Sequence, residues 1–238
     1  MRFSGPVGIK HASSAWRRRL FELAGSRRYS RPGLGDLDAR LAPYLGFEGG
    51  FFIEAGANDG YAQSNTYYLE RYLGWSGVLI EGIPELYARC RRLRRRSRVY
   101  PCALVAPDYP DATVPMHFAN LMSVVDGSLK TADAQDQQIR TGLEIQSLDA
   151  TYTVAVPART LASILDELPQ PVHIDFFSLD VEGAELAVLE GLNLEKYRPV
   201  YILVEARFFD EVDVYLQPHY TLVGQLSHHD YLYRSRAA

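Results

Sequence analysis

Residues 51–60 read FFIEAGANDG, and residues 77–81 read GVLIE. Both stretches contain a short apolar run that ends in an acidic residue, Glu54 in the first and Glu81 in the second. Short, wholly apolar runs are typical of strands that are buried on both faces of a parallel sheet. The two stretches therefore predict neighbouring strands at the centre of such a sheet.

The rest of the chain continues this alternation of strand and helix. The residue patterns predict helices over 61–72, 86–96, 159–168 and 182–191, and strands over 99–104, 174–179, 200–204, 220–226 and 230–234. Short strands that alternate with helices indicate an α/β fold, a parallel sheet with helices on both faces. The last two strands have no helix between them, so we expect them to form an antiparallel pair.

The chain divides into two unequal parts. Residues 1–46 form a predicted basic N-terminal extension with short helices near 16–23 and 37–45, and residues 47–238 form the main domain. Within that domain, residues 107–157 lack a regular pattern, and we interpret them as irregular strands and loops inserted over one face of the domain.

Composition excludes several classes of protein. The chain has 238 residues, 47% of them hydrophobic, and a net charge of -4. Such a chain can bury a large core, and its charge gives no overall attraction to nucleic acid or anionic membranes. Its two cysteines exclude a disulfide framework. No segment approaches the roughly 18 apolar residues of a membrane span, so we expect a cytoplasmic protein.

Four acidic residues stand at or just after the ends of predicted strands. They are Glu54, Glu81, Asp180 and Glu205. Ligands of open parallel sheets bind at the carboxyl ends of the strands, so these carboxylates should line one site.

The glycine-rich turn after the first strand indicates the charge of the ligand. A diphosphate would be repelled by Glu54 and Asp59, whereas a sulfonium or ammonium group would be attracted by them. Glu81 is placed to accept hydrogen bonds from a ribose diol. A cationic centre and a ribose together indicate S-adenosylmethionine.

The segments FFIEAGANDGYAQSNTYYLERYLGWSGVLIEGIPELY (51–87) and FFSLDVEGAELAVLEGL (176–192) resemble the FkbM-type methyltransferases. The resemblance covers roughly residues 50–234. It implies a class I methyltransferase fold, which is a Rossmann-like, seven-stranded, mostly parallel sheet with an antiparallel C-terminal strand. It also implies a set of residues around S-adenosylmethionine: Glu54, Gly56, Asn58, Asp59 and Gly60 at the methionine end, Ser64 and Asn65 near the methionine or the acceptor, Glu81 at the ribose, Cys102 and Ala103 near the adenine, and Asp180.

The resemblance also implies the methyl acceptor, a hydroxyl group of a saccharide or a polyketide-type small molecule, and we expect the insertion 107–157 to lie on the acceptor side of the site. Deprotonation of this hydroxyl needs either a base or a metal ion. The candidate catalytic residues are Asp180, Glu182, His228 and His229. Asp180, Glu182 and Glu205 also offer the oxygen ligands that Mg²⁺ prefers, so a magnesium site is a second possibility.

Two alternatives to a small-molecule O-methyltransferase stay open. Residues 89–98 contain seven arginines, which would suit a nucleic-acid methyltransferase. We favour a solvent-exposed outer helix for this run, because no aromatic residues interleave with the arginines to stack on bases. The other alternative is a non-catalytic binding or scaffold module on the same fold. A homo-oligomer is compatible with the sequence.

Overall fold

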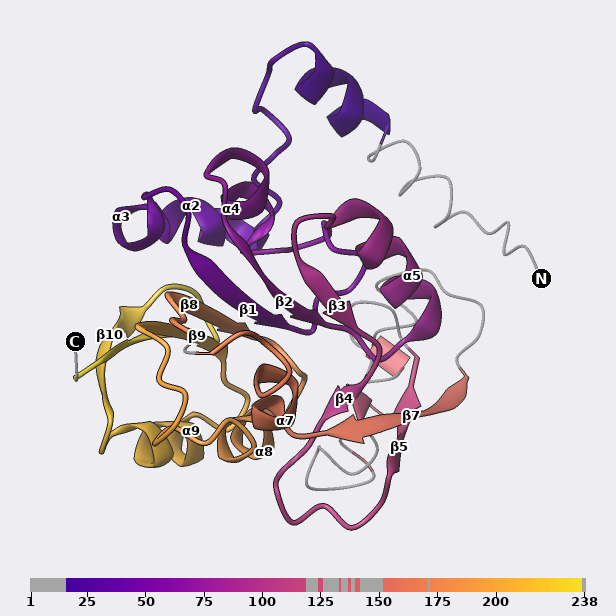
Figure 1. The fold of residues 1–238 in the computed structure, drawn as a ribbon, viewed down its shortest axis with the longest axis vertical. Helices are drawn as coiled ribbons and strands as arrows, with labels where there is room; N and C mark the ends of the chain where they lie inside the picture. Colours follow the sequence, from indigo (N-terminus) through magenta and orange to yellow (C-terminus); the bar gives the residue numbers. More distant parts are fainter. Residues whose placement is uncertain are drawn as a thin grey trace.

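The computed structural model describes residues 16–118, 124–125, 133, 137, 140–141, 152–170 and 172–236. Its centre is a seven-stranded sheet with the strand order β3–β2–β1–β8–β9–β11–β10 (Figure 1). The strands are β1 (Phe51–Ala55), β2 (Ser76–Ile80), β3 (Arg98–Tyr100), β8 (Phe176–Leu179), β9 (Tyr201–Glu205), β10 (Tyr220–Gln225) and β11 (Asp230–Ser235). β11 pairs antiparallel with both β9 and β10, and the other pairings in this sheet are parallel, which confirms the predicted fold class.

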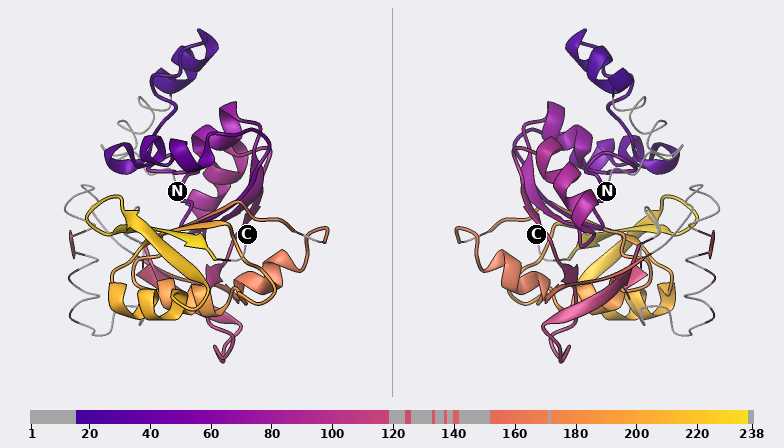
Figure 2. Two further views of the ribbon diagram at one scale, coloured as in Figure 1. Left: turned by 90° about the vertical axis from the view of Figure 1, so that its left-hand side faces the viewer. Right: turned by 90° about the vertical axis from the view of Figure 1, so that its right-hand side faces the viewer.

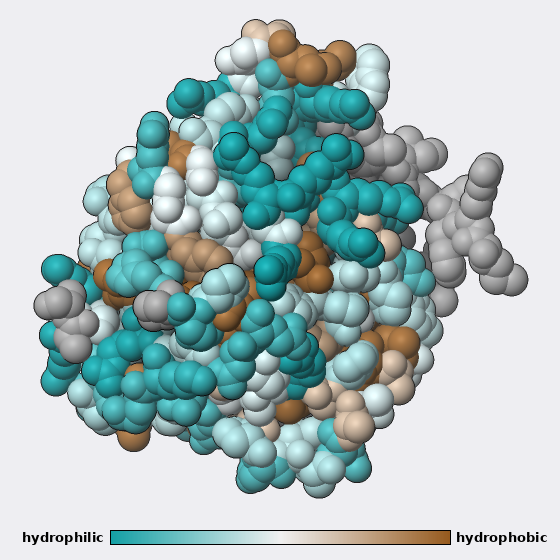
Figure 3. All heavy atoms as spheres, viewed as in Figure 1, coloured by the Kyte–Doolittle hydropathy of each residue, from teal (hydrophilic) through white to brown (hydrophobic). Residues whose placement is uncertain are grey.

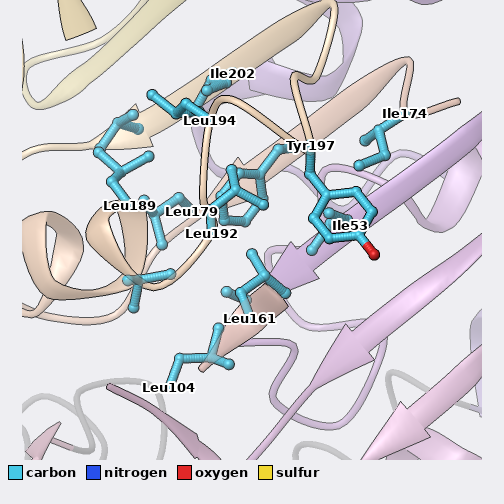
Figure 4. Close-up of a cluster of buried hydrophobic side chains, with 14 of the residues drawn as sticks. Ile53, Leu104, Leu161, Ile174, Leu179, Leu189, Leu192, Leu194, Tyr197 and Ile202 are labelled. Carbon is cyan, nitrogen blue, oxygen red and sulfur yellow. The ribbon is translucent and has the colours of Figure 1, made fainter. Parts of the chain in front are cut away.

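Helices cover both faces of the sheet. Successive side chains of each strand point to opposite faces, so the neighbours Phe52 and Ile53 of β1 pack against different helices. Ile53 of β1 packs in a cluster with α7 (Leu161–Leu165), α8 (Glu185–Glu190) and α9 (Phe209–Leu216), part of which is drawn in Figure 4. Phe52 packs on the other face, in a second cluster with α2 (Leu37–Arg40), α3 (Ala42–Leu45), α4 (Tyr67–Tyr72) and α5 (Pro84–Leu93).

The observed helices differ from the predicted ones at their N-terminal ends. The helix expected from residue 61 begins at Tyr67 as α4, and the one expected from residue 182 begins at Glu185 as α8. Glu182 and Gly183 have φ angles of 55° and 105°, which a right-handed helix does not accommodate. The sequence analysis missed α9 altogether, and the helix expected over 159–168 is confined to α7.

The single strand expected over residues 99–104 is two strands that belong to different sheets. β3 ends at Tyr100, and β4 (Ala103–Leu104) starts a small second sheet with the order β4–β7–β5–β6. Its other members are β5 (Thr113–His117), β6 (Val124–Val125) and β7 (Thr153–Arg159). β5, β6 and most of β7 come from the predicted insertion 107–157, most of whose middle part is outside the described residues.

The N-terminal extension contains the expected helix at 16–23, followed by the short 3-10 helix η1 (Leu34–Asp36). Figures 1 and 2 show helix 16–23 at one end of the molecule, away from the central sheet. Leu37, Leu41 and Leu45 are buried in the cluster around Phe52, so this part of the extension packs on the main sheet. In the described part of the chain, no helix has the length and apolarity that a membrane crossing requires.

Candidate functional site

Strand register brings the four acidic residues to the same edge of the sheet. Ala55 pairs with Ile80 on one side and Leu179 on the other, and Leu179 pairs with Val204. The residues that follow Ile80, Leu179 and Val204 are the acidic ones. Glu81, Asp180 and Glu205 therefore emerge side by side at the carboxyl edge, as the sequence predicted.

A cavity of about 900 Å³, its open mouth included, lies at this edge. Nine of the eleven predicted cofactor residues line it: Glu54, Gly56, Asn58, Ser64, Asn65, Glu81, Cys102, Ala103 and Asp180. Asp59 and Gly60 are not among the lining residues. Asp59 instead accepts hydrogen bonds from the backbone N–H groups of Tyr61 and Ala62, so it shapes the turn from behind.

Glu54 belongs to a buried hydrogen-bond network in which both of its carboxylate oxygens already have protein partners. One of its oxygens accepts hydrogen bonds from Ser64 and Thr66 and from the Arg94 guanidinium, which lies 3.2 Å away. The other oxygen accepts the backbone N–H of Asn65. The carboxylate therefore fixes the loop 64–66 beside the cavity.

Arg94 is the centre of this network. Its side chain is 1% exposed and forms ion pairs with Glu54 and, at 2.9 Å, with Glu70. It also donates hydrogen bonds to Ser64, Thr66 and the Gly60 carbonyl oxygen. The expectation that the arginine run is a solvent-exposed helix is therefore wrong for Arg94, because α5 ends at Leu93 and the chain turns this side chain inward.

The turn that follows β1 contains residues with positive φ angles, a backbone conformation that most residues other than glycine rarely adopt. Gly56 has a φ of 83°, and a Cβ atom there would overlap the carbonyl oxygen of Asp180. Asn58 and Gln63, which also line the cavity, have positive φ angles of 47° and 58°. Such conformations cost free energy and are concentrated at binding sites.

Glu81 lies at the centre of the cavity wall with both carboxylate oxygens already hydrogen-bonded. They accept the backbone N–H groups of Asn58, at 2.8 Å, and Ile83, at 2.7 Å. Burial raises the pKa of Glu81 to about 7, although these two hydrogen bonds oppose the shift. Each carboxylate oxygen can accept a further hydrogen bond, so a diol can still bind here.

Asp180 and Glu205 form a pair of neighbouring carboxyl groups at the ends of the adjacent strands β8 and β9. Burial and the neighbouring Glu205 carboxylate raise the pKa of Asp180 well above its ordinary value. The pKa of Glu205 is also raised, mainly by burial and by Glu182. A neighbouring negative charge and burial both favour the protonated form of a carboxyl, and a carboxylate with a raised pKa is a stronger proton acceptor than an ordinary one.

The charges and polar groups of the cavity fit S-adenosylmethionine. Glu54 and Glu182 are paired with arginines behind the wall, but the cavity's described lining residues include no lysine or arginine that would repel a ligand with cationic groups. The amide oxygen of Asn65 is buried without a hydrogen-bond partner, so it can accept an N–H of an amino group.

An apolar wall of the same cavity fits a flat base. Cys102, Ala103 and Leu104 line it, together with Met116 of β5. A side chain at Gly82 would overlap the Met116 sulfur. The glycine therefore allows Met116 to pack against the backbone next to Glu81. The sequence analysis missed Met116, because it comes from the unpatterned insertion.

The three residues predicted to bind magnesium do not form a metal site. In the residues that the structure describes, no group of three or more His, Cys, Asp or Glu side chains is arranged to hold a metal ion. Glu182 forms an ion pair with Arg207 at 2.8 Å, and the pKa values of Asp180 and Glu205 are both raised, which favours their protonated forms. The arrangement gives the magnesium hypothesis no support.

A second cavity adjoins the first. The two share the lining residues Gln63, Asn65, Ser178 and Asp180. The second is further lined by Leu34, Leu37, Leu179, Leu203, Glu205 and Asp230. The N-terminal extension therefore contributes a wall through Leu34 and Leu37, which the sequence analysis did not foresee.

The two candidate histidines lie outside both cavities. His228 and His229 are exposed in the turn between β10 and β11, and they contact each other at 3.0 Å. Neither is among the described lining residues of either cavity. The geometry therefore favours the carboxyl pair over these histidines as the proton acceptor.

Comparison with known proteins identifies related sequences and folds. The sequence model of the methyltransferase FkbM domain matches residues 54–233, which include all four acidic residues at the sheet edge. No curated protein shows significant similarity to the chain.

Three of the solved structures that the chain matches are methyltransferases by their descriptions. An FkbM methyltransferase from Methylobacillus flagellatus KT is 13% identical with a TM-score of 0.48, and the match covers 87% of this chain and 57% of that one. A TehB-like SAM-dependent methyltransferase from Corynebacterium glutamicum is 11% identical with a TM-score of 0.43, and the match covers 98% and 100% of the two chains. The human methyltransferase 10 domain containing protein is 11% identical with a TM-score of 0.44, over 99% and 97%.

Proposed function

This chain belongs to the FkbM methyltransferase family, and we propose on that basis that it methylates a hydroxyl group of a saccharide or polyketide-type small molecule. The observation that carries the proposal is the pair of adjoining cavities that share Asp180. The lining of the first suits S-adenosylmethionine, and the second places Glu205 and Asp230 beside Asp180 at the adjoining surface.

The proposed cofactor site uses the residues that line the first cavity. Glu81 accepts hydrogen bonds from the ribose hydroxyls, and the Asn65 amide oxygen accepts one from the amino group. Cys102, Ala103 and Met116 contact the base. When bound, S-adenosylmethionine supplies a methyl group on a positively charged sulfur.

The proposed acceptor site is the second cavity. Its carboxyl groups at Asp180, Glu205 and Asp230 disfavour an anionic acceptor and suit hydroxyl groups, which donate hydrogen bonds to them. The Asp180–Glu205 pair takes the hydroxyl proton, since a carboxylate with a raised pKa is a stronger base than an ordinary one. Leu34, Leu37 and Leu203 contact the apolar part of the acceptor.

A methyl-transfer assay tests this proposal. The protein is incubated with S-adenosylmethionine and panels of sugars and polyketide alcohols, in the presence of EDTA, and products are identified by mass spectrometry. With an accepted alcohol, Asp180→Asn should lower turnover by about 10²–10⁴-fold and retain binding of S-adenosylhomocysteine. The control Asp210→Asn, at an exposed position, should leave turnover unchanged. Loss of turnover with EDTA, or full activity of Asp180→Asn, would contradict the assignment.

The pH dependence of kcat/KM follows from the raised pKa values of the pair. The base is active when deprotonated, so kcat/KM should rise with pH, and the rise should lie above the ordinary range of a carboxyl pKa. Glu205→Gln removes the neighbouring negative charge and lowers the pKa of Asp180, so the rise should move to lower pH. A pH profile that is the same in Glu205→Gln as in the wild type would show that the pair is not the base.

A further inference from the structure

Helix 16–23 carries an apolar stripe on its outer side. Trp16, Leu20 and Leu23 are 67%, 44% and 75% exposed. Their spacing of four and then three residues places them on one side of a helix. In Figure 3, brown and tan side chains gather over this helix at the top of the molecule, beside strongly hydrophilic ones. Neither cavity of the site includes them, so the proposed reaction leaves this stripe unused.

The inner side of the helix is fastened to the main domain. The Arg18 guanidinium is buried over the Tyr61 ring at 4.3 Å, and Glu22 accepts a hydrogen bond from the Tyr67 hydroxyl at 2.8 Å. Just beyond the helix, the Arg31 guanidinium lies 3.7 Å from the centre of the Tyr68 ring. These contacts hold the helix on α4 and turn its apolar stripe outward.

The charge around the stripe is strongly positive. Residues 16–31 contain six arginines and one glutamate, in a chain whose net charge is -4. Arg17, Arg19, Arg27 and Arg28 are exposed. An exposed tryptophan and leucines flanked by arginines are typical of helices that lie in the headgroup region of a membrane.

We propose that helix 16–23 docks the protein on an anionic lipid surface, with Trp16, Leu20 and Leu23 inserted among the headgroups and the surrounding arginines paired with lipid phosphates. Charge complementarity selects this partner. A two-fold dimer through this stripe would pack it on the same stripe of a second copy and bring the flanking arginines of the two copies together, whereas an anionic bilayer accommodates both the apolar side chains and the positive charge.

Vesicle sedimentation with the full chain tests the proposal. Phosphatidylcholine vesicles with phosphatidylserine should carry the wild-type protein into the pellet, vesicles of phosphatidylcholine alone should not, and raised salt should weaken the binding. The triple variant Trp16→Ser, Leu20→Ser, Leu23→Ser should reduce binding by roughly tenfold or more. The control Val214→Ser, Leu222→Ser removes apolar side chains that are 69% and 41% exposed elsewhere and should bind as the wild type does.

Tryptophan fluorescence gives a second readout in the same samples. Trp75 is fully buried, so a shift of emission to shorter wavelength on adding anionic vesicles reports Trp16. Equal binding to both kinds of vesicle, or full binding of the triple variant, would overturn the proposal. A wild-type dimer that the triple variant abolishes, without vesicle binding, would also overturn it and assign the stripe to self-association.

Discussion

Arg94→Met should lower the free energy of unfolding by about 3–5 kcal/mol. The substitution leaves the buried carboxylates of Glu54 and Glu70 without their shared positive charge. It also removes the donor that ties Ser64, Thr66 and the Gly60 carbonyl together. A buried carboxylate that loses its partner must be protonated or move to water, and either change disturbs the loop beside the cofactor cavity.

Urea unfolding measures this loss, with Arg95→Met as the matched control. Arg95 is the next residue of the same arginine run, but its side chain is exposed and bonds only the Arg92 carbonyl among the described hydrogen bonds. Arg95→Met should change stability by less than about 0.5 kcal/mol. Equal stabilities of the two variants would mean that the Arg94 network does not support the fold.

Gly56→Ala should reduce the affinity for S-adenosylmethionine by about a hundredfold or more. The added Cβ would overlap the Asp180 carbonyl oxygen, which is backbone and cannot rotate away. The turn after β1 and the end of β8 must then separate, and both carry residues that line the cavity. The positive φ of Gly56 adds a backbone penalty of about 1–2 kcal/mol.

Gly49→Ala separates the two effects. Gly49 has a φ of 77°, close to that of Gly56, but nothing lies within 4 Å of the position its Cβ would take. This control carries the backbone penalty alone, so it should lose stability and retain cofactor affinity. If titration calorimetry finds the same affinity in Gly56→Ala as in Gly49→Ala, the close packing of Gly56 on Asp180 is not needed for binding.

The sequence predicted the acidic edge of the sheet because the signal is local. Glu54, Glu81, Asp180 and Glu205 each follow or end an apolar strand, and parallel strands must bring such ends together. The closing antiparallel strand was predictable for the same reason, since no helix pattern separates residues 220–226 from 230–234. α9 was missed although its residues lie between two predicted strands.

The sequence could not predict which members of a uniform run are buried. Arg94 is one of seven arginines in residues 89–98, and only the end of α5 at Leu93 turns its side chain toward Glu54 and Glu70. Glu54 and Glu70 are buried acidic residues that need a positively charged partner, but they lie 40 and 24 residues from Arg94 along the chain, so the sequence alone did not indicate the pairing.

The walls of the two cavities were equally hard to predict, because they come from distant segments. Met116 reaches the first cavity through the second sheet, and Leu34 and Leu37 reach the second cavity from the N-terminal extension. The assignment of acceptor recognition to residues 107–157 stays a prediction. Under the proposed function, Leu34 and Leu37 would form a further wall on the acceptor side, from a segment that the sequence analysis treated as separate from the domain.

Calorimetric titration with S-adenosylmethionine and S-adenosylhomocysteine tests the central claim most directly. We predict that the wild-type protein binds one molecule of either compound with a Kd in the micromolar range. Glu81→Ala should lose most of this affinity, and Glu48→Ala, at an exposed position, should keep it. Absence of binding to the folded wild-type protein would contradict the cofactor assignment and the methyltransferase function that rests on it.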